Sequence, residues 1–320
     1  MTPAARGLVV VCGRWIFCLR AVIVMDAAEL YQRFKVCMCY KQAASWRKPF
    51  IAPSRFIANQ LRKFGLLRYG IGTVLKVNTF HLPAFTVVSG DPVSDQIMSY
   101  GTYEDELTEA FLRLVQPNQV VVDIGMHLGY FTTLFAQLVG PGGQVHSFEP
   151  TPSTRKLSLA NVSQFPQVTV HPLAVWSSRT TMTFYDYGVQ WMAYNSFTKA
   201  RLETEVKGTP FQVETITLDI FCQTLNRPIA VVKIDAESAE RDILSGAVGL
   251  LASDQPIISL EVGDEGSTEC HSRELVEIIQ KMGYRVWEFR NGRFLVHALR
   301  SNYTYDNLIC APAARDLSSA

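Results

Sequence analysis

Between residues 118 and 290, short apolar segments alternate with longer amphipathic ones. The short segments have the length and β-branched character of buried strands, and the longer ones have a helical period. The predicted strands cover residues 120–124, 144–148, 168–172, 231–234, 257–262 and 285–289. The predicted helices cover residues 130–139, 154–162, 218–225, 239–251 and 272–282. Because this alternation is typical of a parallel sheet with helices on both faces, the pattern predicts an α/β fold.

Two parts of the chain depart from this alternation. Residues 180–217 alternate without a helical period, which predicts an inserted hairpin after the third strand. Residues 26–72 have helical patterns that are broken at Pro49 and Pro53, and residues 103–115 have the apolar face of an amphipathic helix. We therefore predict a helical N-terminal extension over residues 1–72 and one domain over residues 73–320, with strands within residues 74–88.

Charge is distributed unevenly along a chain whose formal net charge is only +1. Residues 1–72 hold twelve Lys or Arg and two acids, a net charge of +10. The overall balance gives no argument for nucleic acid, so we expect no nucleic-acid partner. A local charge of this kind is usual for a solvated helical surface, and it also suits peripheral contact with an anionic membrane or an acidic partner.

The cysteines and the first apolar segment bear on location. The seven cysteines are scattered, without a C-x-x-C pair or zinc-ligand spacing, and this usage suits a reducing cytosol. Residues 7–25 are apolar, but Arg14 and Arg20 divide them, which fits neither a membrane helix nor a signal peptide. We expect a cytoplasmic protein, and peripheral membrane attachment and organelle targeting stay open as alternatives.

The most informative segment is residues 120–129, which reads Val-Val-Val-Asp-Ile-Gly-Met-His-Leu-Gly. It is an apolar strand that leads through a D-x-G-x-x-x-G loop into a helix. In open α/β sheets, ligands bind beyond the carboxyl ends of the strands. The next predicted strand ends just before Glu149, which we expect at the same edge, where a carboxylate can hydrogen-bond both hydroxyls of a ribose. The segment therefore predicts a site for a nucleoside cofactor.

Two cofactors compete for this loop. A dinucleotide site needs G-x-G-x-x-G, but Met126 and His127 follow Gly125 and the middle glycine is missing. Asp123 at the strand end would repel a phosphate and attract the ammonium and sulfonium groups of S-adenosylmethionine. We therefore favour S-adenosylmethionine over NAD, with Gly125 allowing close approach of the adenosyl group. The alternative is that Asp123 and Gly125 form only a tight strand–helix turn.

These motifs and several others resemble the FkbM-type methyltransferases over roughly residues 91–312. The matching segments are residues 101–104, 123–129, 148–150, 195–197, 217–219, 232–240, 258–262, 283–285 and 307–310. The resemblance implies a class I methyltransferase fold, which is Rossmann-like, with a mostly parallel seven-stranded sheet and helices on both faces. It also implies O-methylation of a hydroxyl on a small molecule, such as a sugar, a glycolipid or a polyketide-like natural product.

The chain departs from the family pattern at two places. The family loop usually reads Ala-Asn where this chain has Met126 and His127. In the segment over residues 232–240, the family has Gly where this chain has Ser238. These departures motivate a second hypothesis, a catalytically impaired protein that keeps the fold to bind a ligand or a partner. An NAD-dependent oxidoreductase is a third and less favoured hypothesis, because of the missing glycine.

The predicted donor site combines the loop, its neighbours and the resemblance. We expect Glu149 to hold the ribose, Asp123 to lie near the positive end of the donor, and His127 to donate a hydrogen bond to the donor's carboxylate. The full predicted set is Glu104, Asp123, Gly125, His127, Gly129, Tyr130, Phe131, Glu149 and Pro150.

Methyl transfer to a hydroxyl needs alignment of the two groups and benefits from a base. The candidates are acids at strand ends on the cofactor edge: Asp235, which is preferred, Glu237 and Glu261. Lys233 could pair with them, and the alternative is that these acids cap helices or form an internal ion pair. The same acids would suit Mg²⁺, although no metal site is predicted from the histidines or cysteines.

The insert supplies the candidates for the acceptor side. Its aromatic and amide side chains suit the face of a sugar or a polyketide, and they suit equally a small core that holds the hairpin. The side chains concerned are Tyr187, Trp191, Tyr194 and Asn195.

Overall fold

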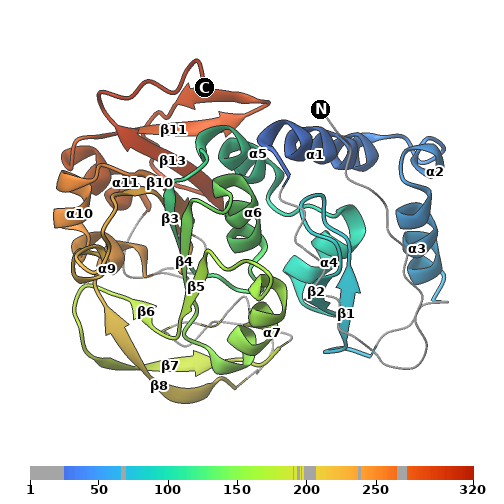
Figure 1. Ribbon diagram of the computed structural model, residues 1–320, viewed down its shortest axis with the longest axis horizontal. Coiled ribbons are helices and arrows are strands. Elements are labelled where there is room, and N and C mark those ends of the chain that lie inside the picture. The colour runs from blue at the N-terminus through green and yellow to red at the C-terminus, as the bar shows by residue number, and fades with distance from the viewer. Residues whose placement is uncertain are drawn as a thin grey trace, which may run out of the picture.

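The computed structural model describes residues 25–65, 70–189, 191, 192, 195, 197, 207–236, 239–264 and 272–320. A large sheet with helices around it occupies the left part of the view in Figure 1, and the N-terminal helices lie at the right. A smaller sheet lies below the large one. The large sheet positions the site described below.

Eight strands of the described part of the chain form the large sheet, in the order β12-β11-β13-β10-β9-β3-β4-β5. Neighbouring strands from β10 to β5 run parallel, whereas β13 is antiparallel to both of its neighbours. Their bounds are β3 Val120–Ile124, β4 Gln144–Phe148, β5 Val168–His171, β9 Ile229–Ile234, β10 Ile257–Val262, β11 Tyr284–Arg290, β12 Arg293–Val296 and β13 Asp306–Pro312. The residues that follow β3, β4 and β9 therefore meet at one edge, as the sequence predicted.

Each central strand contributes to two hydrophobic cores, because successive side chains of a strand point to opposite faces of the sheet. In β3, Val121 enters the core that lies under α5 and α6, whereas Val120 and Val122 enter the core under α8 to α11. The first face carries α5 Asp105–Leu114, α6 Tyr130–Val139 and α7 Pro152–Val162. The second carries α8 Leu218–Cys222, α9 Glu240–Ser245, α10 Val248–Ser253 and α11 Ser272–Lys281. The predicted α/β architecture is confirmed.

The large sheet has eight strands rather than the seven expected, because β12 adds an edge strand to β11. Asn291 and Gly292 form the turn between them with φ of 50° and 74°, and Arg290 pairs with Arg293 across it. Asn-Gly between two strands is itself a strong hairpin signal, because both residues tolerate positive φ. The prediction also omitted β13, which enters the sheet between β10 and β11.

The single helix expected over residues 239–251 is divided into α9 and α10, so this prediction was wrong. Gly246 lies between the two helices, and a β-carbon there would lie 2.5 Å from the carbonyl oxygen of Trp176. The backbone around Trp176 therefore occupies the space beside the helix junction, and only a residue without a side chain fits there.

A smaller sheet follows β5 and lies at the bottom of Figure 1. β7 (Thr181–Asp186) and β8 (Thr209–Ile216) pair antiparallel, and β6 (Ala174–Val175) pairs with β8 in parallel. Phe184 and Val213 form a small core of their own with Ala174.

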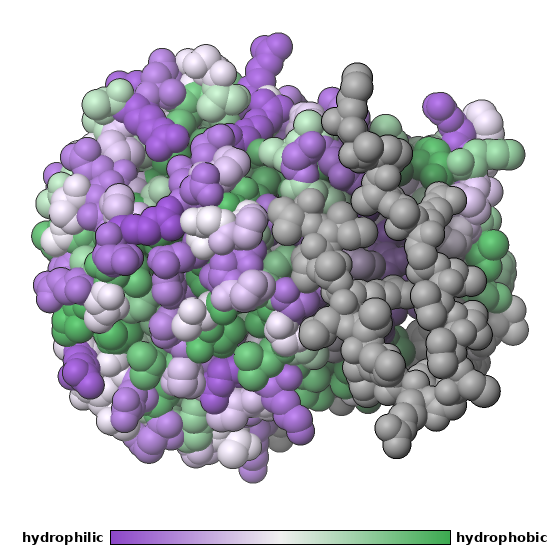
Figure 2. Space-filling model, in the orientation of Figure 1, coloured by the Kyte–Doolittle hydropathy of each residue, from purple (hydrophilic) through white to green (hydrophobic). Residues whose placement is uncertain are grey.

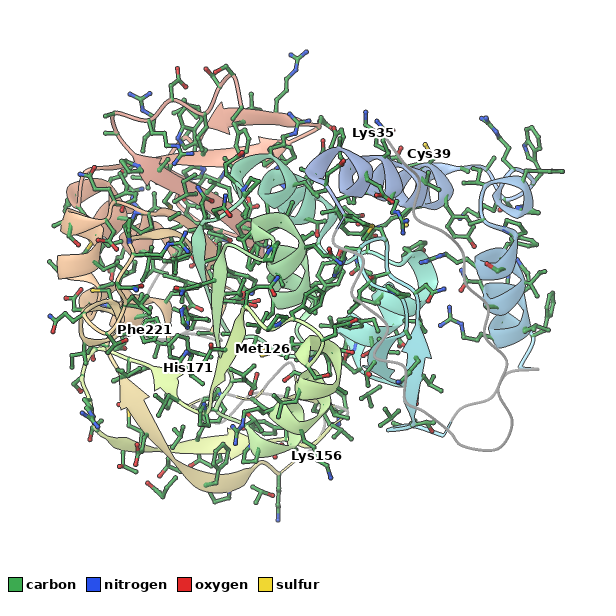
Figure 3. The ribbon with its side chains drawn as sticks, in the orientation of Figure 1. Lys35, Cys39, Met126, Lys156, His171 and Phe221 are labelled. Carbon is green, nitrogen blue, oxygen red and sulfur yellow. The ribbon has the colours of Figure 1, made fainter. Side chains whose placement is uncertain are left out.

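The N-terminal helices differ in how they attach to the rest of the chain. Leu30 and Phe34 of α1 (Ala27–Gln42) are buried in the same core as Phe111 of α5. The other face of α1 carries Lys35 and Cys39, which point away from the domain (Figure 3). α2 (Lys48–Ile51) and α3 (Pro53–Lys63) contain no buried residue. The boundary at residue 72 remains a prediction, since α1 shares the core of the residues that follow it.

The remaining elements connect α3 to the large sheet. β1 (Val74–Val77) and β2 (Phe85–Val88) form an antiparallel pair, and α4 (Pro92–Tyr100) follows β2. In the described segments, no helix has both the length and the apolar composition that crossing a bilayer requires.

The attachment of α1 can be tested by truncating Phe34, whose side chain is 1% exposed and packs edge-on against Phe80 at 5.5 Å. Phe34→Ala should lower the free energy of unfolding by about 3–5 kcal/mol, the range for removing a buried Phe. The matched control is Ile57→Ala on α3, where the side chain is 56% exposed and a change within about 0.5 kcal/mol is expected. Urea unfolding followed by circular dichroism measures both, and equally small changes would show that α1 lies outside the core.

Candidate active site

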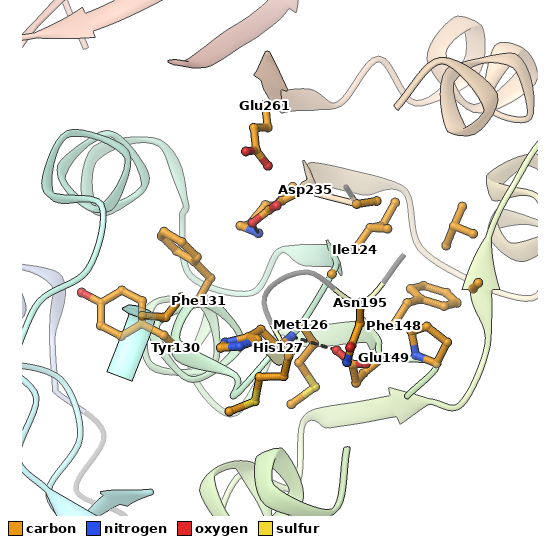
Figure 4. Close-up of a pocket in the computed structure, with 18 of the residues that line it drawn as sticks. Ile124, Met126, His127, Tyr130, Phe131, Phe148, Glu149, Asn195, Asp235 and Glu261 are labelled. Carbon is orange, nitrogen blue, oxygen red and sulfur yellow. Dashed lines mark hydrogen bonds and ion pairs between the residues drawn. The ribbon is translucent and has the colours of Figure 1, made fainter. Parts of the chain in front are cut away.

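A cavity of about 330 Å³ lies beyond the carboxyl ends of β3, β4 and β9. Open α/β sheets bind their ligands at this edge. Asp235 and Glu261 lie near one another in one part of the cavity, and Glu149 lies with Phe148 in another (Figure 4). Further lining residues come from α4, from the small sheet, from the connection between β7 and β8, and from the segment before β13. They are Val93, Gln96, Ala174, Val175, Phe184, Met192, Asn195, Phe197 and Tyr305.

The turn between β3 and α6 forms the floor of the cavity. Gly125, His127 and Gly129 have φ of 79°, 51° and 84°. A β-carbon at Gly125 would overlap the backbone carbonyl oxygen of Asp235. The protein's own backbone therefore makes a close approach that requires this glycine, and the expected approach of the adenosyl group stays a prediction. Gly125 still lines the cavity, whereas Gly129 begins α6 behind it.

Glu149 ties this turn to the end of β4. Its Oε2 accepts a hydrogen bond from the backbone N–H of His127 at 3.1 Å, and its Oε1 accepts one from the backbone N–H of Thr151 at 3.0 Å. Burial raises the pKa of Glu149, and the Thr151 amide opposes that rise only in part. Each carboxylate oxygen keeps a further lone pair, so Glu149 can accept hydrogen bonds from the hydroxyls of a ligand in the cavity.

Asp123 lies behind the cavity and is not among its lining residues. Its fully buried carboxylate accepts a hydrogen bond from the Thr132 hydroxyl at 2.6 Å, and its other oxygen lies 3.8 Å from Lys233 Nζ. Burial raises the pKa of Asp123, while the Lys233 ammonium opposes the rise. The geometry thus makes Asp123 a counter-charge to Lys233, and its expected place near the positive end of the donor stays a prediction.

Lys233 links Asp123 to the cavity. Its Nζ donates a hydrogen bond to Asp235 Oδ2 at 2.7 Å and lies 5.1 Å from the centre of the Phe131 ring. Burial acts to lower the pKa of Lys233, but the carboxylates of Asp235 and Asp123 outweigh it and hold the pKa above its ordinary value. Lys233 is therefore a buried cation within the wall of the cavity.

Asp235 faces the cavity from the end of β9. Burial acts to raise its pKa, but the Lys233 ammonium and a hydrogen bond with Glu261 hold it below the ordinary value. Asp235 is therefore a carboxylate at neutral pH. Glu261 from β10 lines the same part of the cavity.

Glu104 closes the cavity from the residue before α5. It accepts hydrogen bonds from the Tyr305 hydroxyl and from Asn307 Nδ2, the latter at 2.8 Å. Its Oε2 atom is buried without a hydrogen-bond partner. Burial, and after it the charge of Asp235, raises the pKa of Glu104. The wall therefore contains a carboxylate oxygen that a hydrogen-donating or cationic ligand group can satisfy.

His127 and Asp91 meet beside the β3–α6 turn. His127 Nε2 lies 3.6 Å from Asp91 Oδ1, and both atoms are buried without a hydrogen-bond partner. The other oxygen of Asp91 accepts a hydrogen bond from the backbone N–H of Ser94 at 2.7 Å and so caps α4. His127 thus carries an unsatisfied ring nitrogen on a side chain that lines the cavity.

Most of the predicted site residues line this cavity. They are Glu104, Gly125, His127, Tyr130, Phe131, Glu149, Pro150, Asp235 and Glu261. Glu237 and Ser238 lie outside the described residues, as does Tyr194. Of the predicted acceptor wall, Asn195 lines the cavity, whereas Tyr187 and Trp191 are not among its lining residues. In the described segments, no three His, Cys, Asp or Glu side chains are arranged to hold a metal ion.

Residues that the sequence analysis did not predict complete the lining. Val93 and Gln96 come from α4, Tyr305 comes from the segment before β13, and Phe197 comes from the connection between β7 and β8. No local motif marks Val93, Gln96 or Tyr305, whereas Phe197 lies in one of the segments that carried the family resemblance.

Comparison with known proteins identifies methyltransferases. The "31-O-demethyl-FK506 methyltransferase FkbM" of Streptomyces tacrolimicus is 25% identical over 198 residues, which cover 54% of this chain and 75% of that protein. A solved FkbM methyltransferase from Methylobacillus flagellatus matches with 13% identity and a TM-score of 0.37, and the match covers 68% of this chain and 52% of that one. An S-adenosylmethionine-dependent O-methyltransferase from Thermotoga maritima matches with 12% identity and a TM-score of 0.39, covering 79% and 82%.

The family comparison covers the region that builds the cavity. The profile described as "Methyltransferase FkbM domain" matches residues 123–286, just over half of the chain. The matched region begins at Asp123 and includes Glu149, Lys233, Asp235 and Glu261. The chain therefore belongs to the FkbM family of S-adenosylmethionine-dependent methyltransferases.

Proposed function

We propose that this chain transfers a methyl group to a hydroxyl of a small-molecule acceptor, such as a sugar, a glycolipid or a polyketide-like compound. The observation that carries the proposal is the Asp235 carboxylate, which Lys233 holds by a hydrogen bond of 2.7 Å on the cavity wall. A hydroxyl must lose its proton when it is methylated, and an ionised carboxylate beside the donor can receive that proton.

The charges around the cavity suit S-adenosylmethionine as the donor. When bound, S-adenosylmethionine supplies an activated methyl group on a sulfonium. Glu149 would accept hydrogen bonds from the ribose, and the apolar side chains of Phe148 and Leu173 beside it would hold the adenine. Glu104 has a carboxylate oxygen without a partner that the donor's ammonium can satisfy. His127, which lines the cavity, is the residue expected to bind the donor's carboxylate.

The chain's own residues orient the acceptor more than they activate it. Because Lys233 lowers the pKa of Asp235, this carboxylate is a weak base that stays ionised. A weak base suffices here, since methyl transfer from a sulfonium mainly requires that the nucleophile be aligned with the methyl group. Lys233 pairs with Asp123 of β3 and with Asp235 at the end of β9. The sheet therefore fixes the position of Asp235, the carboxylate proposed to contact the acceptor.

The named activity of the Streptomyces relative also supports an oxygen acceptor, because its name describes a 31-O-demethyl substrate. The direct test is to incubate the chain with labelled S-adenosylmethionine and a panel of glycosides, polyketides and small phenols. Formation of a product whose methyl group lies on oxygen, shown by mass spectrometry, is expected. A product methylated on nitrogen or carbon would contradict the proposal. Donor binding without any product would favour the non-catalytic hypothesis that Met126 and His127 motivate.

Asp235→Asn keeps the shape of the side chain and removes its basicity. We expect turnover to fall at least tenfold with nearly unchanged donor affinity, because the proton acceptor is lost while Glu149 is kept. The melting temperature is measured as well, since Asp235 also pairs with Lys233. Asp316→Asn, at an exposed position near the C-terminus, is the matched control and should leave turnover unchanged. Equal turnover in both variants would remove Asp235 from the mechanism, and Glu261 would be tested next.

Glu149→Ala removes the carboxylate assigned to the ribose. Donor affinity should fall by about 1.5–3 kcal/mol, the scale of a hydrogen bond to a charged group. Isothermal titration calorimetry measures it, and Glu214→Ala on the exposed side of β8 serves as the control. If Glu149→Ala binds the donor as tightly as the parent chain, the donor lies elsewhere in the cavity.

Donor affinity should also depend on pH through Glu149. Because burial raises its pKa, this carboxylate takes up a proton at a higher pH than an ordinary Glu, for which the pKa is about 4.3. Protonation removes an acceptor for the ribose hydroxyls, so donor affinity should weaken as the pH falls from about 7.5 to about 5. Glu149→Gln should bind more weakly but with little change over this range. A pH dependence that persists in Glu149→Gln would assign the titrating group to another residue.

A further inference from the structure

The region from residue 30 to residue 90 contains no acid. It holds ten basic residues, whereas the chain as a whole has 30 basic and 29 acidic residues. Within it, the segment from the N-cap of α2 to the end of α3 carries Arg47, Lys48, Arg55, Arg62 and Lys63. Acids outside this region pair with two of these bases, in the ion pairs Arg33–Glu29 and Lys41–Asp105. Arg47 and Lys63 are exposed.

Large apolar side chains on these two helices and directly beside them are exposed. Phe50 is 84% exposed, Trp46 is 72% exposed and Phe64 is 71% exposed, with Ile57 also exposed. Figure 2 shows hydrophobic residues together with hydrophilic ones along the right edge of the molecule, where α2 and α3 lie in Figure 1. We call the surface formed by Trp46, Phe50, Ile57 and Phe64 with the exposed bases Arg47 and Lys63 the α2–α3 surface. Single exposed apolar residues are ordinary, but several large ones on two short adjoining helices mark a site of interaction.

Polar contacts hold α3 in this orientation. Asn59 Nδ2 donates hydrogen bonds to the Tyr40 hydroxyl at 3.0 Å and to the backbone carbonyl of Ser99 at 2.9 Å. Arg55 donates one to the backbone carbonyl of Asn78 at 2.9 Å. α3 itself has no buried residue. Its attachment to the domain thus uses its polar side, and Ile57 and Phe64 remain exposed.

We propose that the α2–α3 surface binds the surface of an anionic lipid bilayer. A helix that combines basic residues with Trp and Phe on its apolar side lies in the headgroup region, where the rings enter the acyl boundary and the cations meet the lipid phosphates. The exposed bases Arg47 and Lys63 favour an anionic partner, and the exposed rings favour a bilayer, whose acyl boundary they can enter. This contact is separate from methyl transfer, since none of these residues lines the cavity.

The test uses the full-length chain and sedimentation with vesicles of phosphatidylglycerol and phosphatidylcholine, and with vesicles of phosphatidylcholine alone. The chain should bind the anionic vesicles, and binding should weaken as salt is added. Phe50→Ser combined with Phe64→Ser should lower the partition coefficient by about tenfold or more, because each ring removes apolar area from the contact. Arg47→Glu combined with Lys63→Glu should also weaken binding and reduce its dependence on salt.

Two controls separate this surface from a general effect. Leu295→Ser combined with Val296→Ser alters exposed apolar residues of β12 and should leave vesicle binding unchanged. All variants should keep the melting temperature and the methyltransferase activity of the parent chain, because the exchanged side chains lie outside the core and the cavity.

Four outcomes would overturn the proposal. The first is that the parent chain fails to bind anionic vesicles. The second is that all α2–α3 variants bind as the parent does, which would assign the contact to another segment, such as the apolar residues 7–25. The third is a concentration-dependent dimer in analytical ultracentrifugation that Phe50→Ser with Phe64→Ser abolishes, in the absence of vesicle binding. The fourth is salt-sensitive binding to an oligonucleotide without binding to vesicles.

Discussion

The site depends on one buried cation, Lys233, and on the two carboxylates that hold it. A buried ammonium is stable only when it is paired, and removing one partner of a buried ion pair costs about 3–5 kcal/mol. Asp123 supplies one partner from β3, and Asp235 supplies the other from the end of β9. Asp123 and Lys233 are also paired in the register of the two strands. The ion network therefore ties the central strands together at the edge where the cavity opens.

The same network sets the charge of the cavity. Lys233 lowers the pKa of Asp235, whereas burial and the charge of Asp235 raise the pKa of Glu104. Two carboxyl groups in one cavity are thus shifted in opposite directions, an arrangement that gives acids of similar type different tasks. In the proposed function, Asp235 stays ionised for the acceptor, and Glu104 has an oxygen available for the donor. Glycine at position 125 belongs to this arrangement, because it lets the backbone of Asp235 lie against the β3–α6 turn.

The chain also separates opposite charges in space. Acids gather around the cavity at the sheet edge, whereas residues 30–90 contain bases and no acid. α1 connects the two parts, since Leu30 and Phe34 enter the core of the sheet while α2 and α3, which follow it, bury no residue. A domain boundary drawn from charge and pattern alone falls after α3, but the hydrophobic core begins earlier, because burial follows individual apolar residues and not the composition of a region.

The sequence by itself determined the local elements and the chemistry of the loop. β3, β4, β10 and α6 have the bounds that the apolar pattern predicts, because a buried strand and an amphipathic helix are periodic over a few residues. Only the tertiary structure decided which of the predicted acids face the cavity: Asp123 lies behind Lys233, and Glu149, Asp235 and Glu261 line the wall. It also decided that Tyr305 and Val93 join them and that Phe64, directly after α3, is exposed. These contacts join residues far apart in the chain. The directions of their side chains follow from tertiary packing, which a local sequence pattern does not determine.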